Sequence, residues 1–294
     1  MEYIRHIIAD FPYKLGKTKM DQLYGQLKVV LANKIDSYMN SKIAYKTKPR
    51  KDINSFVEAF YGMLDQGGKY KNLKATYGIS AGSFCNYIKL CDQSKILTET
   101  HYDIINEYQS VLSNDKITDT FTLRAKEGTE CKGYHHKEKS KKGTSVSLII
   151  ETNKIPLACY VDSASIDDRE MLWNTLPDPD AKSITLHRMF ADKGYVGNNF
   201  RNIGLDRKVQ LVCPPKTTRG GGKTHTLSSN DVNDLKKYRN KIEHVNSIYR
   251  NFRSVDVRYV KRIRTFNCFI HLVTILVTIM QLKNKLQNTS DLCS

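Results

Sequence analysis

The chain has 294 residues, with 47 Lys and Arg against 30 Asp and Glu, so its formal net charge is +17. Hydrophobic residues make up 40% and charged residues 26%, a globular composition that argues against a disordered, collagenous or low-complexity protein. So large an excess of positive charge indicates nucleic acid as the first candidate partner and an acidic membrane surface as the second. The longest apolar tract, residues 269–282, falls short of the roughly 20 apolar residues of a bilayer span, so we expect a buried helix and no membrane partner.

The first third of the chain is expected to be basic and helical. Residues 1–50 are rich in Lys and show no strong periodicity, so they are treated as a basic N-terminal region. From residue 53 the apolar positions follow the spacing of a helix that ends at Gly67-Gly68, and a second helix is expected over 70–77. A short turn containing glycine then leads into a third helix over 83–96.

Helix, short turn and helix is the pattern of a helix-turn-helix, so residues 51–114 are predicted to form a small helical DNA-binding domain. Ser83, Asn86 and Lys89 on the last of these helices would contact DNA. An ordinary pair of packed helices shows the same pattern, and this alternative stays open on the sequence.

From residue 115 to residue 294 the pattern changes to α/β. Strict alternation predicts a strand over 117–123, followed by strands over 146–152 and 156–163 and a helix over 167–176. Strands over 184–191 and 209–213 and long helices over 231–252 and 264–286 complete this part. Three successive strands and then alternating strands and helices indicate a mixed sheet flanked by helices.

Three carboxylates stand at positions where an α/β sheet can build a site. Asp119 lies inside the first strand, where an acid is unfavourable unless something compensates it. Asp192 follows the fourth strand, and Glu243 lies on the first long helix. Together they could hold two Mg²⁺ ions, which would activate a hydroxyl nucleophile and stabilise the leaving oxygen of a phosphodiester. Each acid alone could equally form a salt bridge, cap a turn or belong to a solvated helix face.

Glu243 shares one side of its helix with Lys236, Arg239 and Arg250, apart from the apolar stripe that must face the core. One interpretation is a metal-binding acid flanked by bases that contact phosphate. The other is a solvated face with an Arg–Glu ion pair at i,i+4.

These residues carry a resemblance to the catalytic domain of bacterial insertion-sequence DDE transposases. The branch concerned has its third acid in a Tyr-x2-Arg-x3-Glu-x6-Lys signature, where Arg239 and Glu243 match, Arg250 replaces the Lys and Lys236 replaces the Tyr. The segment Ala-Asp-Lys-Gly-Tyr at 191–195 is similar to the second-acid motif. Residues 119–124 resemble the strand of the first acid, and Asp167-Asp168 stands where the family usually has His-Asp. The likeness covers roughly residues 115–285.

The resemblance implies a ribonuclease-H-like fold and a DNA transposase, which cleaves at transposon ends and transfers the 3′-hydroxyl to target DNA. It implies that Asp119, Asp192 and Glu243 hold two Mg²⁺ or Mn²⁺ ions. The partners would be double-stranded DNA, as terminal inverted repeats and target, with the protein forming a homo-oligomer on it. The residues expected to contact DNA in this half are Lys193, Arg239, Arg250, Lys236, Lys141 and Lys142.

Other functions remain compatible with these patterns. One is a transposase-derived DNA-binding protein that has lost catalysis, and another is a metal-dependent nuclease that cleaves without joining. A basic structural nucleoprotein is a third, although it has no use for ordered carboxylates. The expected location is the cytoplasm or nucleoid in a bacterium, and the nucleus or a viral factory for a eukaryotic or viral host.

Overall fold

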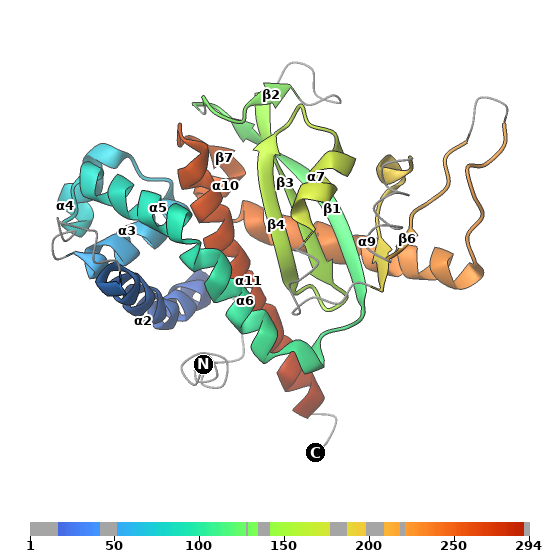
Figure 1. Ribbon diagram of the computed structural model, residues 1–294, viewed down its shortest axis with the longest axis horizontal. Helices are drawn as coiled ribbons and strands as arrows, with labels where there is room; N and C mark the ends of the chain where they lie inside the picture. The colour runs from blue at the N-terminus through green and yellow to red at the C-terminus, as the bar shows by residue number, and fades with distance from the viewer. Residues whose placement is uncertain are drawn as a thin grey trace. The chain divides into compact units, whose positions relative to one another are not determined.

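A computed structural model describes residues 17–41, 52–127, 129–134, 142–176, 187–197, 209–217 and 221–290 (Figure 1). The chain divides into two compact units. The first holds Met1–Glu107, Glu127–Thr129 and Arg250–Ser294, and the second holds Tyr108–Lys126 and Glu130–Tyr249. The sequence placed the C-terminal helix with the sheet, whereas its contacts group it with the N-terminal helices, because its apolar surface packs on them.

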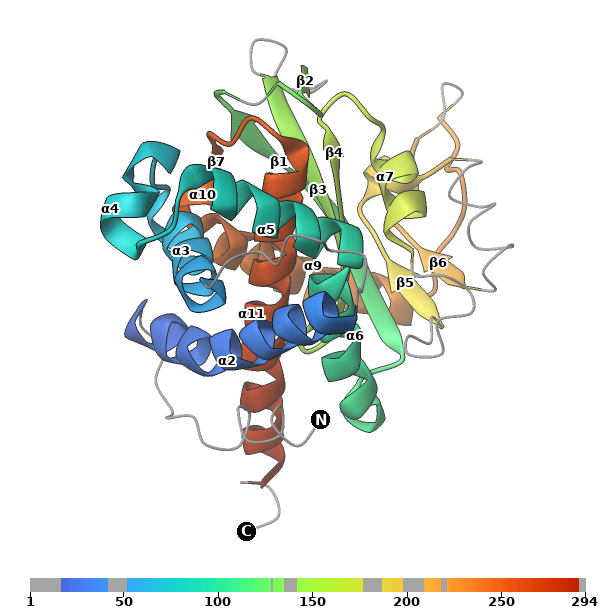
Figure 2. The same cartoon turned by 60° about the vertical axis from the view of Figure 1, so that its left-hand side comes forward.

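The first unit is a helical bundle in which α5 and α6 pack along α11 (Figure 2). By length and composition alone, Ile263–Gln287 of α11 could cross a membrane, so the expectation that this tract is too short was wrong. The expected buried helix is confirmed, because 83% of its most apolar window is buried. The elements of this unit are α2 (Lys17–Ser41), α3 (Ile53–Gln66), α4 (Leu73–Tyr77), α5 (Ala81–Ser94), α6 (Ile96–Glu107), α10 (Arg253–Asp256), β7 (Val257–Arg258) and α11 (Ile263–Ser290).

The long helix α2 was not expected from the sequence. Its buried side chains recur at helical spacing and pack on α3, and the Tyr24 hydroxyl donates a hydrogen bond to the carbonyl of Val57. Lys and other polar residues lie between these apolar positions, and for that reason the sequence did not predict the helix. The buried residues are Leu23, Tyr24, Leu27, Leu31 and Ile35.

The expected helix, turn and helix is present at α4 and α5. Gly78 adopts a left-handed conformation (φ +74°) that ends α4. The Ser80 hydroxyl caps α5 by accepting a hydrogen bond from the backbone N–H of Ser83 at 3.0 Å. Lys95, also left-handed (φ 56°), ends α5, and α6 then begins as a further helix that the sequence had not indicated.

Ser83, Asn86 and Lys89 are all exposed on α5. They recur every three residues, so they share one side of the helix, while Phe84 and Tyr87 are buried on the other. The predicted DNA-contacting residues therefore form a polar face that solvent can reach.

The second unit is a mixed sheet whose strands follow the order β4-β3-β1-β5-β6. The first three are antiparallel neighbours, and β5 and β6 run parallel to β1. This arrangement agrees with the ribonuclease-H-like fold that the resemblance implied. The strands are β1 (Asp115–Ala125), β2 (Gly133–Tyr134), β3 (Lys142–Glu151), β4 (Pro156–Ser163), β5 (Arg188–Phe190) and β6 (Gln210–Val212). The predicted strand over 184–191 lies partly outside the described residues.

Two helices cover opposite faces of this sheet. In Figure 1, α7 (Asp168–Thr175) lies in front of the strands and α9 (Ser229–Arg250) passes behind them. The alternation of side chains along β1 agrees with this placement, because Asp119 and Phe121 of β1 contact α9. Thr120, which points to the other face, pairs with the Tyr195 hydroxyl at 2.9 Å. The α9 side of β1 therefore carries the predicted first acid.

Candidate functional site

A cavity of about 110 Å³ in the second unit is lined by all three predicted carboxylates, Asp119, Asp192 and Glu243. Strand register explains how they meet. The start of β1 pairs in parallel with β5, with Ile117 opposite Phe190, so the chain leaves β5 beside the part of β1 that carries Asp119. Asp192 follows at the carboxyl end of β5, where sheets of this class generally build their sites. α9 then brings Glu243 across the same opening.

Asp119 is the least exposed of the three acids. Its Oδ2 accepts a hydrogen bond from Nδ2 of Asn246 at 3.0 Å. The pKa of Asp119 is raised from 3.8 to about 6. Burial is the largest cause and the negative charges of Asp168 and Asp192 add to it, while hydrogen bonds to the carboxylate oppose it. The sequence indicated that the charge of an acid inside a strand needs compensation, and the amide of Asn246 supplies part of it.

Asp192 is exposed and begins a tight turn. Its Oδ1 accepts a hydrogen bond from the backbone N–H of Lys193 at 2.7 Å, so it caps the 3₁₀ turn Lys193–Tyr195. Tyr195 is buried and its hydroxyl meets Thr120 of β1, which fixes the turn against the sheet. The motif at 191–195 thus combines an acid facing the cavity with a buried aromatic anchor.

Glu243 is exposed and ion-paired with Arg239 one turn earlier, with 3.0 Å between Oε1 and Nε. The side chains are 56% and 69% exposed, so a pair of this kind contributes only about 0.3–0.5 kcal/mol. The hydrogen bond to Glu243, and then the charge of Asp192, raise the pKa of Arg239 above its ordinary value. Arg239 therefore stands among the acids as the cation of this cavity.

Carboxylate oxygens are the donors that Mg²⁺ and Mn²⁺ prefer, so the lining fits such an ion in kind. Within the described ranges, however, no three His, Cys, Asp or Glu side chains lie close enough together to hold a metal ion. Glu243 is turned toward Arg239 and Asp192 toward its own turn. Because the Glu243 ion pair is weak and exposed, a cation would have little to displace at that residue.

The other predicted DNA-contacting residues vary in their surroundings. Lys193, Lys236 and Arg250 are exposed. Lys142, at the start of β3, is exposed and lies over the ring of Tyr134, 4.9 Å from its centroid. Lys141 lies outside the described residues.

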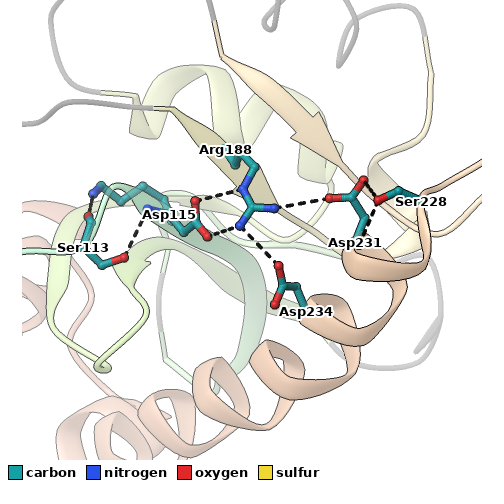
Figure 3. Close-up of polar contacts among 7 residues, drawn as sticks. Ser113, Asp115, Arg188, Ser228, Asp231 and Asp234 are labelled. Carbon is teal, nitrogen blue, oxygen red and sulfur yellow. Dashed lines mark hydrogen bonds and ion pairs between the residues drawn. The ribbon is translucent and has the colours of Figure 1, made fainter.

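An ion-pair cluster that the sequence did not reveal joins the elements of the site (Figure 3). Arg188, at the start of β5, binds Asp115 at the start of β1 through two hydrogen bonds. The same guanidinium reaches Asp231 at 3.4 Å and Asp234 at 3.2 Å, both near the start of α9. β1, β5 and α9 are therefore tied together at the ends that precede the three cavity acids.

Sequence reasoning also missed Asn246 and the electrostatic effect of Asp168 on Asp119. Asn246 did leave a signal, because it is a polar residue on the stripe that also carries Ile242 and Tyr249, which face the core. A polar residue at such a position needs a partner.

Comparison with known proteins identifies the family to which the chain belongs. Among curated protein sequences, none matches the chain. A solved structure of the piggyBac transposase synaptic complex with hairpin DNA aligns with a TM-score of 0.47 and 10% identity, covering 99% of this chain and 75% of that chain. Residues 114–279, more than half of the chain, match the model of the transposase DDE domain. On the strength of that match, the chain belongs to the transposase DDE domain family.

Proposed function

We propose that this protein is a DNA transposase that cleaves DNA at transposon ends with divalent metal and joins the freed 3′-hydroxyl to target DNA. The observation that supports this most is the single cavity onto which β1, the turn after β5 and α9 bring Asp119, Asp192 and Glu243. Members of this family are typically catalytic and generally use divalent metals.

Asp119, Asp192 and Glu243 are the residues that would hold two Mg²⁺ or Mn²⁺ ions. When bound, such ions activate a hydroxyl nucleophile and stabilise the leaving oxygen of a phosphodiester. Asp192 and Glu243 are exposed, so DNA backbone can approach them from solvent. Arg239, whose side chain is 69% exposed, would bind a phosphate oxygen beside them.

DNA binding would involve both units. On α5, Ser83, Asn86 and Lys89 would contact terminal repeats, and Lys193, Lys236 and Arg250 would contact phosphates nearer the cavity. With a net charge of +17, binding should weaken steeply as salt rises. The proposed working form is a homo-oligomer on DNA, in the nucleoid of a bacterium or in the nucleus or viral factory of another host.

The test is cleavage of a supercoiled plasmid that carries the DNA flanking the gene, with Mg²⁺ or Mn²⁺. Asp192→Asn and Glu243→Gln should each lower cleavage by at least about 10²–10³-fold while DNA binding is retained. Glu170→Gln, an exposed acid on α7 that does not line the cavity, is the matched control and should cleave like wild type.

The products separate the alternatives. A strand-transfer product indicates a transposase, whereas cleavage without joining indicates a nuclease. DNA binding by wild type without any cleavage would instead support a transposase-derived protein that has lost catalysis. Undiminished cleavage by either cavity variant would refute the assignment of these acids.

A further inference from the structure

Asn246 lies three residues after Glu243 on α9, almost one helical turn away. It is buried, with only 8% of its surface exposed. It is not among the residues that line the cavity, and its Nδ2 donates a hydrogen bond to Oδ2 of Asp119 at 3.0 Å. That bond joins α9 to the middle of β1 across 127 positions of sequence. Asn246 therefore contacts one cavity acid and lies one turn from another.

The orientation of the Asn246 amide is dictated by its partner. An ionised carboxylate only accepts hydrogen bonds, so the amide must present its NH₂ group to Asp119. In this orientation the Oδ1 of Asn246 is buried and has no hydrogen-bond partner within the described part of the chain. A leucine would fill a similar volume and leave no unpaired acceptor, so packing alone favours an apolar residue here. What the amide adds over leucine is its contact with Asp119.

We propose that Asn246 is a positioning residue that fixes the Asp119 carboxylate for a divalent cation. By holding Oδ2 of Asp119, which lines the cavity, it fixes the carboxylate and leaves its remaining lone pairs for a cation. The inference rests on the proposed function, because it assigns Asn246 a role toward the cation that Asp119 would bind. Residues that orient metal ligands in this way typically change metal affinity by about 10–100-fold when removed.

The competing explanation is a structural hydrogen bond that only holds α9 against β1. The two roles predict different results for Asn246→Leu. Loss of a structural bond should lower the melting temperature of the metal-free protein and leave its Mn²⁺ affinity unchanged. Loss of a positioning residue should weaken Mn²⁺ binding whatever the change in melting temperature, because the same bond and the same unpaired acceptor are removed under either role.

The experiment measures Mn²⁺ binding to the full-length protein by electron paramagnetic resonance, together with its melting temperature without metal. The Mn²⁺ binding that is lost in Asp192→Asn is assigned to the cavity site. Asn246→Leu is expected to raise the dissociation constant of that site at least about tenfold. Asn240→Leu, an exposed residue on the same helix, is the matched control and should bind Mn²⁺ like wild type. If circular dichroism shows that Asn246→Leu does not fold, Asn246→Ala replaces it.

The outcomes distinguish a failure of the role assigned to Asn246 from a failure of the proposed function. If wild type binds Mn²⁺ at the cavity and Asn246→Leu binds it equally well, the inference about Asn246 is overturned while the proposed function stands. If wild type binds no Mn²⁺ there, the metal role of the cavity is overturned and the inference with it.

Discussion

The second unit contains two groups of three carboxylates and one arginine, and both groups are built on β1, α9 and the β5 region. In the first, Arg188 binds Asp115, Asp231 and Asp234 at once (Figure 3). The second group is Asp119, Asp192 and Glu243, which line the cavity. Asp119 lies four residues after Asp115 on β1, and Asp192 lies four residues after Arg188, just past the end of β5. In this second group Arg239 is ion-paired, among the residues that the structure describes, with Glu243 only.

The difference lies in where the compensating positive charge comes from. Arg188 is 31% exposed and its three partners are 13–26% exposed, so one shielded guanidinium satisfies the first group from within. In the cavity the acids keep separate partners, and the pKa of Asp119 rises to about 6, chiefly because the carboxylate is buried. The first group holds elements together, and the second is suited to an external cation.

Removing the shared cation should have the largest effect on stability. Arg188→Ala leaves three partly buried carboxylates without their common partner, so we expect the free energy of unfolding to fall by about 2–4 kcal/mol at pH 7. Urea unfolding measures this. Arg169→Ala is the control, since it removes a single Arg–Asp pair whose carboxylate is 52% exposed and should cost less than about 1 kcal/mol. Equal losses in the two variants would contradict a special role for Arg188.

Neutralising the first cavity acid should have an opposite effect on stability. Since the pKa of Asp119 is raised from 3.8 to about 6, metal-free wild type loses stability as the pH rises through that interval. Asp119→Asn removes this dependence and should be more stable at pH 7 by up to about 2–3 kcal/mol. It should also lose cleavage.

The measurement is the melting temperature from pH 4 to pH 8 without metal. Adding Mn²⁺ should raise the melting temperature of wild type at pH 7 but not that of Asp119→Asn. A variant whose stability follows the same pH profile as wild type would show that Asp119 is not the titrating group.

Arg239 should show the smallest effect on stability. Because its pair with Glu243 is exposed, Arg239→Ala should change the free energy of unfolding by less than about 0.5 kcal/mol. Its expected consequence is weaker DNA binding with a shallower salt dependence, measured by fluorescence anisotropy of labelled duplex at several salt concentrations. A loss of stability as large as that of Arg188→Ala would remove the contrast between the two groups.

Much of this site could be predicted from the sequence. Alternation in β1 placed Asp119 inside a strand, the glycine turn placed Asp192 at a strand end, and helical spacing placed Glu243 apart from the core stripe. The structural alternatives for these acids are also present, since Asp192 caps a turn and Glu243 pairs with Arg239. α2 and α6 were missed, because scattered polar residues hid the first helix and a left-handed Lys95 separated the second from α5.

Local pattern by itself determined which elements form in the second unit and which carboxylates they carry, because strand and helix periodicities depend on nearby residues. Only the tertiary structure decided how those residues combine. The parallel pairing of β1 with β5 brings Asp119 and Asp192 to the same end of the sheet, and the packing of α9 on β1 brings Asn246 into contact with Asp119. Arg188 meets carboxylates 73, 43 and 46 positions away. Contacts over such separations arise from packing of the whole sheet, which no short stretch of sequence encodes.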